Sequence, residues 1–166
     1  KNFKNKRLKF STDVNNSVKK SDIVFICVGT PTKRNSSEAD LSQIYSVTNE
    51  ISKSINKFKI IITKSTVPVT TGDNIEKILS KKADKNKFSV VSNPEFLREG
   101  EALRDFIYPD RVVVGSNNKK SNVILKNLYL PLISKGAKFI STNRRAAELI
   151  KYASNAFLAT KISFIN

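Results

Sequence analysis

The sequence has no histidine, no methionine, no tryptophan and a single cysteine, and its 14 acidic residues are fewer than half its 30 basic ones. Without histidine, neither imidazole acid–base catalysis nor a histidine-ligated metal site can be built here, and we expect no metal. One cysteine excludes an intrachain disulfide, which agrees with a reducing cytoplasm. The longest apolar run, at 23–28, is far short of the roughly 20 residues that span a bilayer. These absences predict a cytoplasmic globular protein with no membrane segment.

Positive charge dominates the composition, with a formal net charge of +16. Clustered lysine and arginine would indicate phosphate-backbone binding, but here basic residues occur in nearly every segment and no aromatic-plus-basic motif of a nucleic-acid module is present. The basic stretch at 1–10 lacks the apolar core of a signal peptide. We therefore expect an anionic small ligand such as a nucleotide, and hold a nucleic-acid partner as the weaker alternative.

Short apolar runs alternate with helix-period stretches, which predicts an α/β domain with a doubly wound, mainly parallel sheet. Helices are expected at 72–81, at 121–133 and at 40–56, where Asp40 and Gln43 form a capping-box pattern. Strands are expected at 23–28, 59–63, 88–92, 111–114 and 138–141.

From Thr142, which can cap a helix, an uninterrupted helical pattern runs to the end of the sequence. The change of pattern predicts one domain over 1–141 and the start of a long helix over 142–166. Because the pattern has no stop signal and the sequence does not begin with methionine, we expect an internal piece of a longer protein.

Two of the predicted strands run into hydroxyl-rich loops. In the first, GTPT at 29–32, glycine would let a ligand approach the backbone and threonine could donate to phosphate or ribose. The second, KSTVPV at 64–69, places Ser65 and Thr66 at a strand end. A simple turn and an ordinary helix entry are the alternatives. Two such loops in one sheet indicate a shared crevice, whereas Cys27, among apolar neighbours, is interpreted as core packing.

A third strand end leads into the carboxylates Glu95 and Glu99. If the segment is helical, both face one way, and one of them buried beside a substrate could act as a general acid or base. The alternative is an ordinary capped helix start. On the last predicted helix, Lys151 and Asn155 also share a face and could stabilise an oxyanion, or a desolvated Lys151 could act as a base. Simple solvent exposure of Lys151 is the alternative.

Four ordered blocks resemble the UDP-glucose/GDP-mannose dehydrogenase family: GTPT, KSTVPV, SNPEFLREG with DF and PDRVVVG, and AELIKYASNAFLATKISFIN. Together they extend over nearly the whole chain, which makes the signal far stronger than a lone motif. The resemblance implies a Rossmann-like NAD-binding domain lacking its first βαβ part, followed by the central helix through which this family forms homodimers. It also implies two hydride transfers from UDP-glucose to NAD, giving UDP-glucuronate, with a cysteine holding the substrate as a thiohemiacetal and then a thioester.

The resemblance also implies roles for particular residues. Catalytic roles are implied for Glu95 as the acid–base group of thioester hydrolysis, for Lys151 and Asn155 as the pair that steadies the oxyanion, and for Thr66 in holding water. Cofactor contacts are implied for Gly29, Thr30, Thr32, Ser65, Thr66 and Glu99. Substrate contacts are implied for Glu95, Phe96, Leu97, Arg98, Glu99, Lys151 and Asn155.

Several parts of the family pattern are missing from these residues. They are the Gly-rich fingerprint, the acidic ribose-binding residue, the nucleophilic cysteine with its GFGGSC-like loop, and the C-terminal UDP-sugar-binding domain. Cys27 belongs to the cofactor-domain strand and cannot replace that nucleophile, so we expect no dehydrogenase activity from the 166 residues alone. Thr70 stands where the family often has glycine, with Gly72 nearby. GDP-mannose or another nucleotide sugar is the alternative substrate, and a non-catalytic basic nucleotide-binding module or a dimerisation scaffold the alternative kind of protein.

Overall fold

A five-stranded sheet in the order β1-β2-β3-β4-β5 forms the centre of the computed structural model, which describes residues 4–5 and 7–166. The basic start of the chain therefore lies partly outside the described residues. All neighbouring strands are parallel except β3 and β4, which are antiparallel. The strands are β1 (Ile23–Ile26), β2 (Lys59–Thr63), β3 (Phe88–Ser92), β4 (Arg111–Ser116) and β5 (Lys138–Thr142). The predicted α/β fold with a mainly parallel sheet is confirmed.

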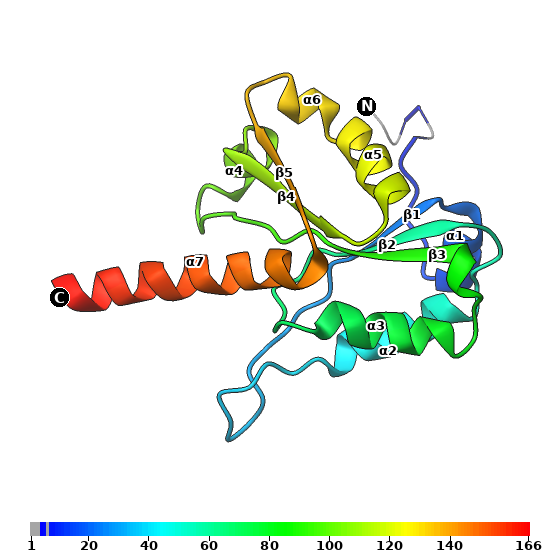
Figure 1. The fold of residues 1–166 in the computed structure, drawn as a ribbon, viewed down its shortest axis with the longest axis horizontal. Coiled ribbons are helices and arrows are strands. Elements are labelled where there is room, and N and C mark those ends of the chain that lie inside the picture. Colours follow the sequence, from blue (N-terminus) through cyan, green and yellow to red (C-terminus); the bar gives the residue numbers. More distant parts are fainter. Residues whose placement is uncertain (1–3, 6) are drawn as a thin grey trace.

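Helices cover both faces of this sheet (Figure 1). One face carries α1 (Val14–Lys20), α2 (Ser42–Ser52) and α3 (Thr71–Ser80). The other carries α5 (Lys119–Leu128) and α6 (Leu130–Ile133). A short 3-10 turn, η1 (Lys85–Lys87), precedes β3, and α4 (Ala102–Ile107) precedes β4.

Burial on both faces of the sheet explains the three consecutive isoleucines of β2. Ile61 packs with the side chains of α1, α2 and α3, whereas Ile60 and Ile62, one position to either side, pack with those of α5. Side chains alternate across a strand, so a central parallel strand needs apolar residues at successive positions. This alternation divides the core into two layers, one on each side of the sheet.

The last helix, α7 (Arg144–Ile165), starts against the sheet and then projects away from it (Figure 1). Its first turn approaches β4 at Gly115, where an added Cβ would lie 2.5 Å from the Cβ of Ala147 and 2.7 Å from the carbonyl oxygen of Asn143. Only glycine permits this approach. Among residues 4–5 and 7–166, none of the helices combines the length and apolarity that crossing a membrane requires.

Two predicted helix starts are wrong. Asp40 is not the cap of α2, because Leu41 takes the capping position and the Asp40 carboxylate accepts the N–H of Ser42, 2.9 Å away, in a turn before the helix. Thr142 stays in β5, and Asn143 caps α7 by accepting the N–H of Ala146 at 2.9 Å. In each case sequence alone placed the cap one residue early.

The predicted helix at 121–133 is two helices, and the predicted core role of Cys27 is wrong. Pro131 lacks the N–H that would continue the hydrogen-bond ladder of α5, so the chain turns at Tyr129 and restarts as α6. Strand β1 ends at Ile26, and Cys27 lies just after it as an exposed thiol. Among the described strands β1 pairs only with β2, which leaves its outer flank, including Phe25, uncovered.

Candidate active site

The loops that follow β1 and β2 lie side by side at the carboxyl edge of the sheet. The Thr30 hydroxyl donates to the carbonyl of Thr66 at 2.9 Å, and the Ser65 hydroxyl donates to the carbonyl of Val28 at 2.6 Å. These hydroxyls therefore join the two loops. Gly29 is exposed, and a Cβ there would have its nearest neighbouring heavy atom 4.0 Å away, so a ligand has room against the backbone.

The structure joins Thr30 to the second loop but carries Thr32 away from it. Thr32 is exposed and forms an isolated antiparallel bridge with Ala39 in the loop before α2. Of the predicted cofactor contacts, Gly29, Thr30, Ser65 and Thr66 lie together in the two joined loops at the ends of β1 and β2.

Lys151 and Glu95 form the ion pair at the centre of the site. The Lys151 ammonium lies 3.1 Å from the Glu95 carboxylate, and the two side chains are 7% and 29% exposed. The ring of Phe96 also faces the ammonium, with its centroid 5.3 Å away. Lys151 comes from the second turn of α7 and Glu95 from the loop after β3, so the sheet and the long helix meet here. The alternative of a solvent-exposed Lys151 is excluded.

The segment from Glu95 to Glu99 is not helical, which corrects the idea that both acids share one helical face. The Glu95 carboxylate oxygen that does not pair with Lys151 accepts the N–H of Leu97 at 2.6 Å, and the N–H of Arg98 donates to Asp105 at 2.9 Å. These local acceptors replace those of a helix. As a result Glu95 is half-buried at the site, whereas Leu97, Arg98 and Glu99 are exposed.

A cavity of about 570 Å³ lies beside this segment, which is within the usual range for a small-molecule site. Arg98 grips Asp105 at the cavity wall through two side-chain hydrogen bonds of 3.0 and 2.7 Å, and this contact lowers the pKa of the Asp105 carboxyl to about 2. The Arg111 guanidinium stacks 4.4 Å from the centroid of Phe96. The wall includes Lys64, Asn93, Glu95, Phe96, Arg98 and Tyr108.

Asn93 forms a hub at the floor of this cavity that the sequence analysis missed. Its side-chain oxygen accepts from the Tyr129 hydroxyl and from the Lys64 ammonium, 3.3 Å away, and its amide donates to the carbonyl of Val113 at 2.7 Å. Burial raises the pKa of Tyr129 to about 12, so the phenol remains a donor. Burial lowers the pKa of Lys64, although the Glu95 carboxylate opposes that shift. The positions of Lys64 and Asn93 at two successive strand ends were the available signal.

Asn155 lies one turn beyond Lys151 on α7 and is exposed. No hydrogen bond among the described residues joins Asn155 to Lys151. The close partner of Lys151 is instead Glu95, which lies 56 positions earlier in the sequence.

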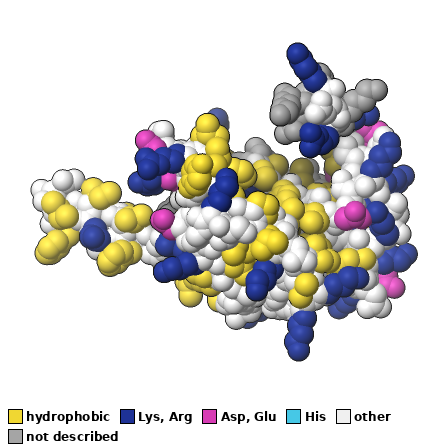
Figure 2. All heavy atoms as spheres, turned by 90° about the horizontal axis from the view of Figure 1, so that it is seen from above, with side chains coloured by type: hydrophobic (Ala, Val, Ile, Leu, Met, Phe, Trp, Pro, Cys, Tyr) yellow, Lys and Arg dark blue, Asp and Glu magenta, His cyan; other side chains and the backbone are white. Residues whose placement is uncertain are grey.

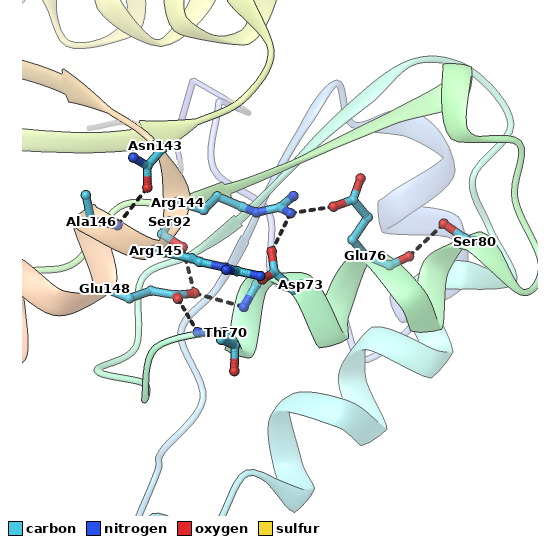
Figure 3. Close-up of polar contacts among 11 residues, drawn as sticks. Thr70, Asp73, Glu76, Ser80, Ser92, Asn143, Arg144, Arg145, Ala146 and Glu148 are labelled. Carbon is cyan, nitrogen blue, oxygen red and sulfur yellow. Dashed lines mark hydrogen bonds and ion pairs between the residues drawn. The ribbon is translucent and has the colours of Figure 1, made fainter.

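Glu148 is a second missed residue, buried one turn before Lys151. Its carboxylate accepts the N–H groups of Thr70 and Gly72, each at 2.8 Å, and the hydroxyl of Ser92 at 3.1 Å (Figure 3). Burial raises the pKa of Glu148, and these three hydrogen bonds oppose the rise. A glutamate three positions from Lys151 on the helix face that packs on the sheet was the signal available in the sequence.

Two family descriptions match the chain. Residues 1–133 match the NAD binding domain of the UDP-glucose/GDP-mannose dehydrogenase family, and residues 145–166 match the central domain of the same family. The predicted cofactor, NAD, is confirmed by the first match.

Individual relatives agree with these descriptions. The chain is 54% identical over 160 residues to a UDP-glucose 6-dehydrogenase of Rickettsia felis, covering 96% of this chain and 35% of that protein. A UDP-glucose dehydrogenase structure from Pyrobaculum islandicum has a TM-score of 0.91 at 38% identity, covering 99% of this chain and 38% of that one. A GDP-mannose dehydrogenase structure from Pseudomonas aeruginosa has a TM-score of 0.87 at 37% identity, covering 97% and 38%.

The chain spans little more than a third of the length of these relatives. Within that span the two matched domains follow the order of the sequence blocks that resemble the family. The chain belongs to the UDP-glucose/GDP-mannose dehydrogenase family.

Proposed function

We propose that the complete protein oxidises UDP-glucose to UDP-glucuronate and passes two hydrides to NAD. The primary alcohol and one water become a carboxylate, and two NADH and three protons are the other products. A cysteine outside these 166 residues holds the carbon between the two oxidations, first as a thiohemiacetal and then as a thioester. The observation that carries the proposal is the pair of Lys151 with Glu95, 3.1 Å apart beside the cavity.

In this proposal Lys151 stabilises negative charge on the reacting oxygen. An ammonium has three donors, and pairing with Glu95 uses one, so the others can reach a substrate oxygen. Because the Lys151 side chain is only 7% exposed, little water screens its charge from that oxygen. Asn155, one turn along α7, is proposed as a second donor to the same oxygen.

Glu95 is proposed to move protons during hydrolysis of the thioester. It is half-buried and adjoins both the cavity and the ammonium, which is the position that a general base for an attacking water requires. Thr66, in the neighbouring strand-end loop, is proposed to help hold that water. Phe96, Leu97, Arg98 and Glu99 are proposed to line the sugar.

The joined loops at the ends of β1 and β2 are proposed to hold the nicotinamide cofactor of the matched domain. Bound NAD would supply the hydride acceptor. This chain would contribute the open backbone at Gly29 and the joined loops of Thr30, Ser65 and Thr66. Thr32 and Glu99, both exposed, are proposed as contacts at the rim.

The choice of substrate rests on the curated relatives rather than on the fold. Structures of a UDP-glucose and a GDP-mannose dehydrogenase resemble the chain almost equally, at 38% and 37% identity, whereas the 54% identical relative is a UDP-glucose 6-dehydrogenase. The test is to count NADH formed by the complete protein with limiting UDP-glucose, and we expect two per sugar. Activity only with GDP-mannose or an N-acetylated sugar would refute the substrate. Nucleotide binding with no NADH from any nucleotide sugar would favour the non-catalytic module.

We also propose that residues 142–166 begin the central domain and that α7 forms part of a homodimer interface. The family matches end at residue 133 and resume at 145, and the far part of α7 exposes Phe157, Leu158 and Ile162 (Figure 2). A Phe157→Ser/Ile162→Ser variant of the complete protein should stay folded but lower the dimer fraction in light scattering, with a lower melting temperature because the dimer contact is lost. An unchanged dimer fraction would place the interface elsewhere. The cytoplasmic location stays a prediction.

A further inference from the structure

We propose that Glu148 is a positioning residue for the proposed reaction, because its carboxylate fixes the helix that carries Lys151 to the loop and the strand end that carry the other site residues. The inference rests on the proposed function. Glu148 is not part of the wall of the 570 Å³ cavity and is not a member of the Lys151–Glu95 ion pair.

The argument starts from the burial of Glu148, which is 2% exposed. A buried carboxylate is costly unless donors satisfy it. Here three donors do so, and all of them lie outside α7: the main-chain N–H groups of Thr70 and Gly72 and the side-chain hydroxyl of Ser92. The Glu148 carboxylate thus joins α7 to two other segments of the chain, the start of α3 and the end of β3.

Each of these segments carries a residue of the candidate site a few positions away. Glu148 lies three residues before Lys151, so both project from one face of α7. Ser92 ends β3 three residues before Glu95. Thr70 lies four residues after Thr66 and immediately before α3. A shift at Glu148 would therefore move Lys151 relative to the Glu95 carboxylate and relative to the loop after β2.

The contacts of Glu148 differ in kind from the other contacts that join α7 to α3. Arg144 reaches the side chains of Asp73, at 2.7 Å in the first turn of α3, and of Glu76, three positions further along the helix (Figure 3). Glu148 instead binds main-chain groups where the loop becomes the helix. Arg144 therefore attaches one helix to the other, whereas Glu148 sets the path of the loop.

The backbone around these bonds has little freedom to relax. Thr70 has a φ of 81°, in the left-handed region, which orients its N–H toward α7 only while that conformation is held. At Gly72 an added Cβ would lie 3.0 Å from the Glu148 carboxylate and 3.1 Å from Cδ of Arg144. The close fit means that loss of the carboxylate would leave two N–H groups without their acceptor at a point where no side chain can replace it.

The test is Glu148→Gln in the complete protein, with Glu76→Gln as the matched control. A glutamine has one acceptor oxygen and an amide donor, so it cannot accept from Thr70 and Gly72 as the two carboxylate oxygens do. We expect amide hydrogen exchange at 70–72 to speed up at least about 10-fold. We expect kcat to fall roughly 10- to 100-fold, as for a small misplacement of catalytic groups, with the KM for UDP-glucose changed by less than about threefold.

The control removes one partner of Arg144 from the same helix contact without touching the loop. Glu76→Gln should leave exchange at 70–72 unchanged and kcat within about twofold of the wild type. If Glu148→Gln does not fold, Glu148→Asp, which keeps the charge but shortens the side chain by one methylene, should show the same direction of change in exchange and kcat.

Three results would overturn the proposal. Folded Glu148 variants with wild-type exchange and kcat would show that the carboxylate holds nothing the reaction needs. A fall in kcat with unchanged exchange would assign Glu148 a direct role instead of a positioning one. Equal effects of Glu148→Gln and Glu76→Gln on exchange and kcat would show that both residues only attach α7 to α3. A wild-type protein that forms no NADH from any nucleotide sugar would refute the proposed function, while exchange at 70–72 would still decide whether Glu148 holds the loop.

Discussion

The first and last parts of α7 show opposite relations between polarity and burial. The near part, 144–151, buries three charged side chains, those of Arg144, Glu148 and Lys151. The far part, 152–165, exposes apolar side chains along the projecting helix (Figure 2). Phe164, for example, is 90% exposed. Charged groups are rarely buried unless they are paired, and contiguous apolar surface usually marks a contact. The comparison teaches that polar contacts hold the near part of α7 in place on the sheet. The far part has an apolar surface that is suited to packing against protein outside these residues.

The largest expected effect is on kcat, and it compares one lysine from each part of α7. Replacing Lys151, in the near part, with methionine should lower kcat of the complete protein by about 10²- to 10³-fold, because a preorganised donor to the reacting oxygen is lost. Replacing Lys161, in the far part, with methionine should leave kcat within about twofold, since that ammonium lies over the exposed ring of Phe157. Steady-state kinetics on both variants measures this. Similar losses from the two substitutions would break the comparison.

The second effect tests how closely the near part is packed. Gly115→Ala places a Cβ 2.5 Å from that of Ala147 and should lower the free energy of unfolding by about 1–3 kcal/mol. Gly29→Ala is the control, because its Cβ would meet nothing nearer than 4.0 Å, and it should change the free energy by less than about 0.5 kcal/mol. Urea denaturation gives both values. A stable Gly115→Ala protein would mean that α7 can move off β4 at little cost.

The third effect concerns Thr70, a non-glycine residue in the left-handed region. A β-branched residue at a φ of 81° is strained, so Thr70→Gly should raise the free energy of unfolding by about 1 kcal/mol. Thr71→Gly should act in the opposite direction, because Thr71 begins α3, is 2% exposed and donates its hydroxyl to the carbonyl of Pro68. Thermal or urea unfolding of the two variants checks the signs. Equal signs would show that strain at Thr70 does not matter.

The smallest effect is a pH dependence confined to the near part. Burial raises the folded-state pKa of Glu148 above its usual 4.5, so the folded protein binds more protons than the unfolded chain just above that pH. Stability should therefore fall as pH rises from 4.5 through the folded-state pKa, and Glu148→Gln should remove that fall. Burial also acts on Asp73, but Arg145 and Arg144 hold its pKa below 3.8, outside this window.

Unfolding free energies measured at intervals above pH 4.5 test this dependence. Phe157→Ser serves as the control because residues 152–165 contain no acidic side chain, so the slope should match that of the wild type. An unchanged slope in Glu148→Gln would assign the dependence to another carboxyl.

The sequence predicted the strands and the choice of Glu95 and Lys151, but not how the two residues meet. The sequence analysis paired Glu95 with Glu99 and Lys151 with Asn155 because it assumed that each pair lies on one helix, where residues four apart are neighbours. The observed pair spans two elements and depends on how α7 packs against β3 and β4, which no local pattern encodes.

The burial of individual side chains was also hard to predict from local sequence. Cys27 has apolar sequence neighbours, yet β1 pairs on one side alone among the described strands, which leaves the thiol exposed. Glu148 is charged and therefore of a type usually found at the surface, yet it is buried. The three groups that donate hydrogen bonds to its carboxylate belong to residues 56 to 78 positions earlier in the sequence. The error at Cys27 and the omission of Glu148 have one cause, since exposure depends on which elements cover a strand or helix and not on the residue type.

The antiparallel pairing of β3 with β4 bears on the order in which the molecule comes apart. It comprises two residue pairs, Val91 with Ser116 and Ser92 with Gly115, whereas β2 with β3 and β4 with β5 each have five. Asn93 adds two side-chain hydrogen bonds across this junction, since its amide donates to the carbonyl of Val113 and its oxygen accepts from the Tyr129 hydroxyl. With so few strand bonds, the main attachment of β4 and β5, with α5 and α6, to β1–β3 is the packing of Ile60 and Ile62 against α5. We expect the two groups of strands to part on warming when that contact opens, before either group melts. The hub at the cavity floor would then be lost early, and with it the site, while most of the sheet is still folded.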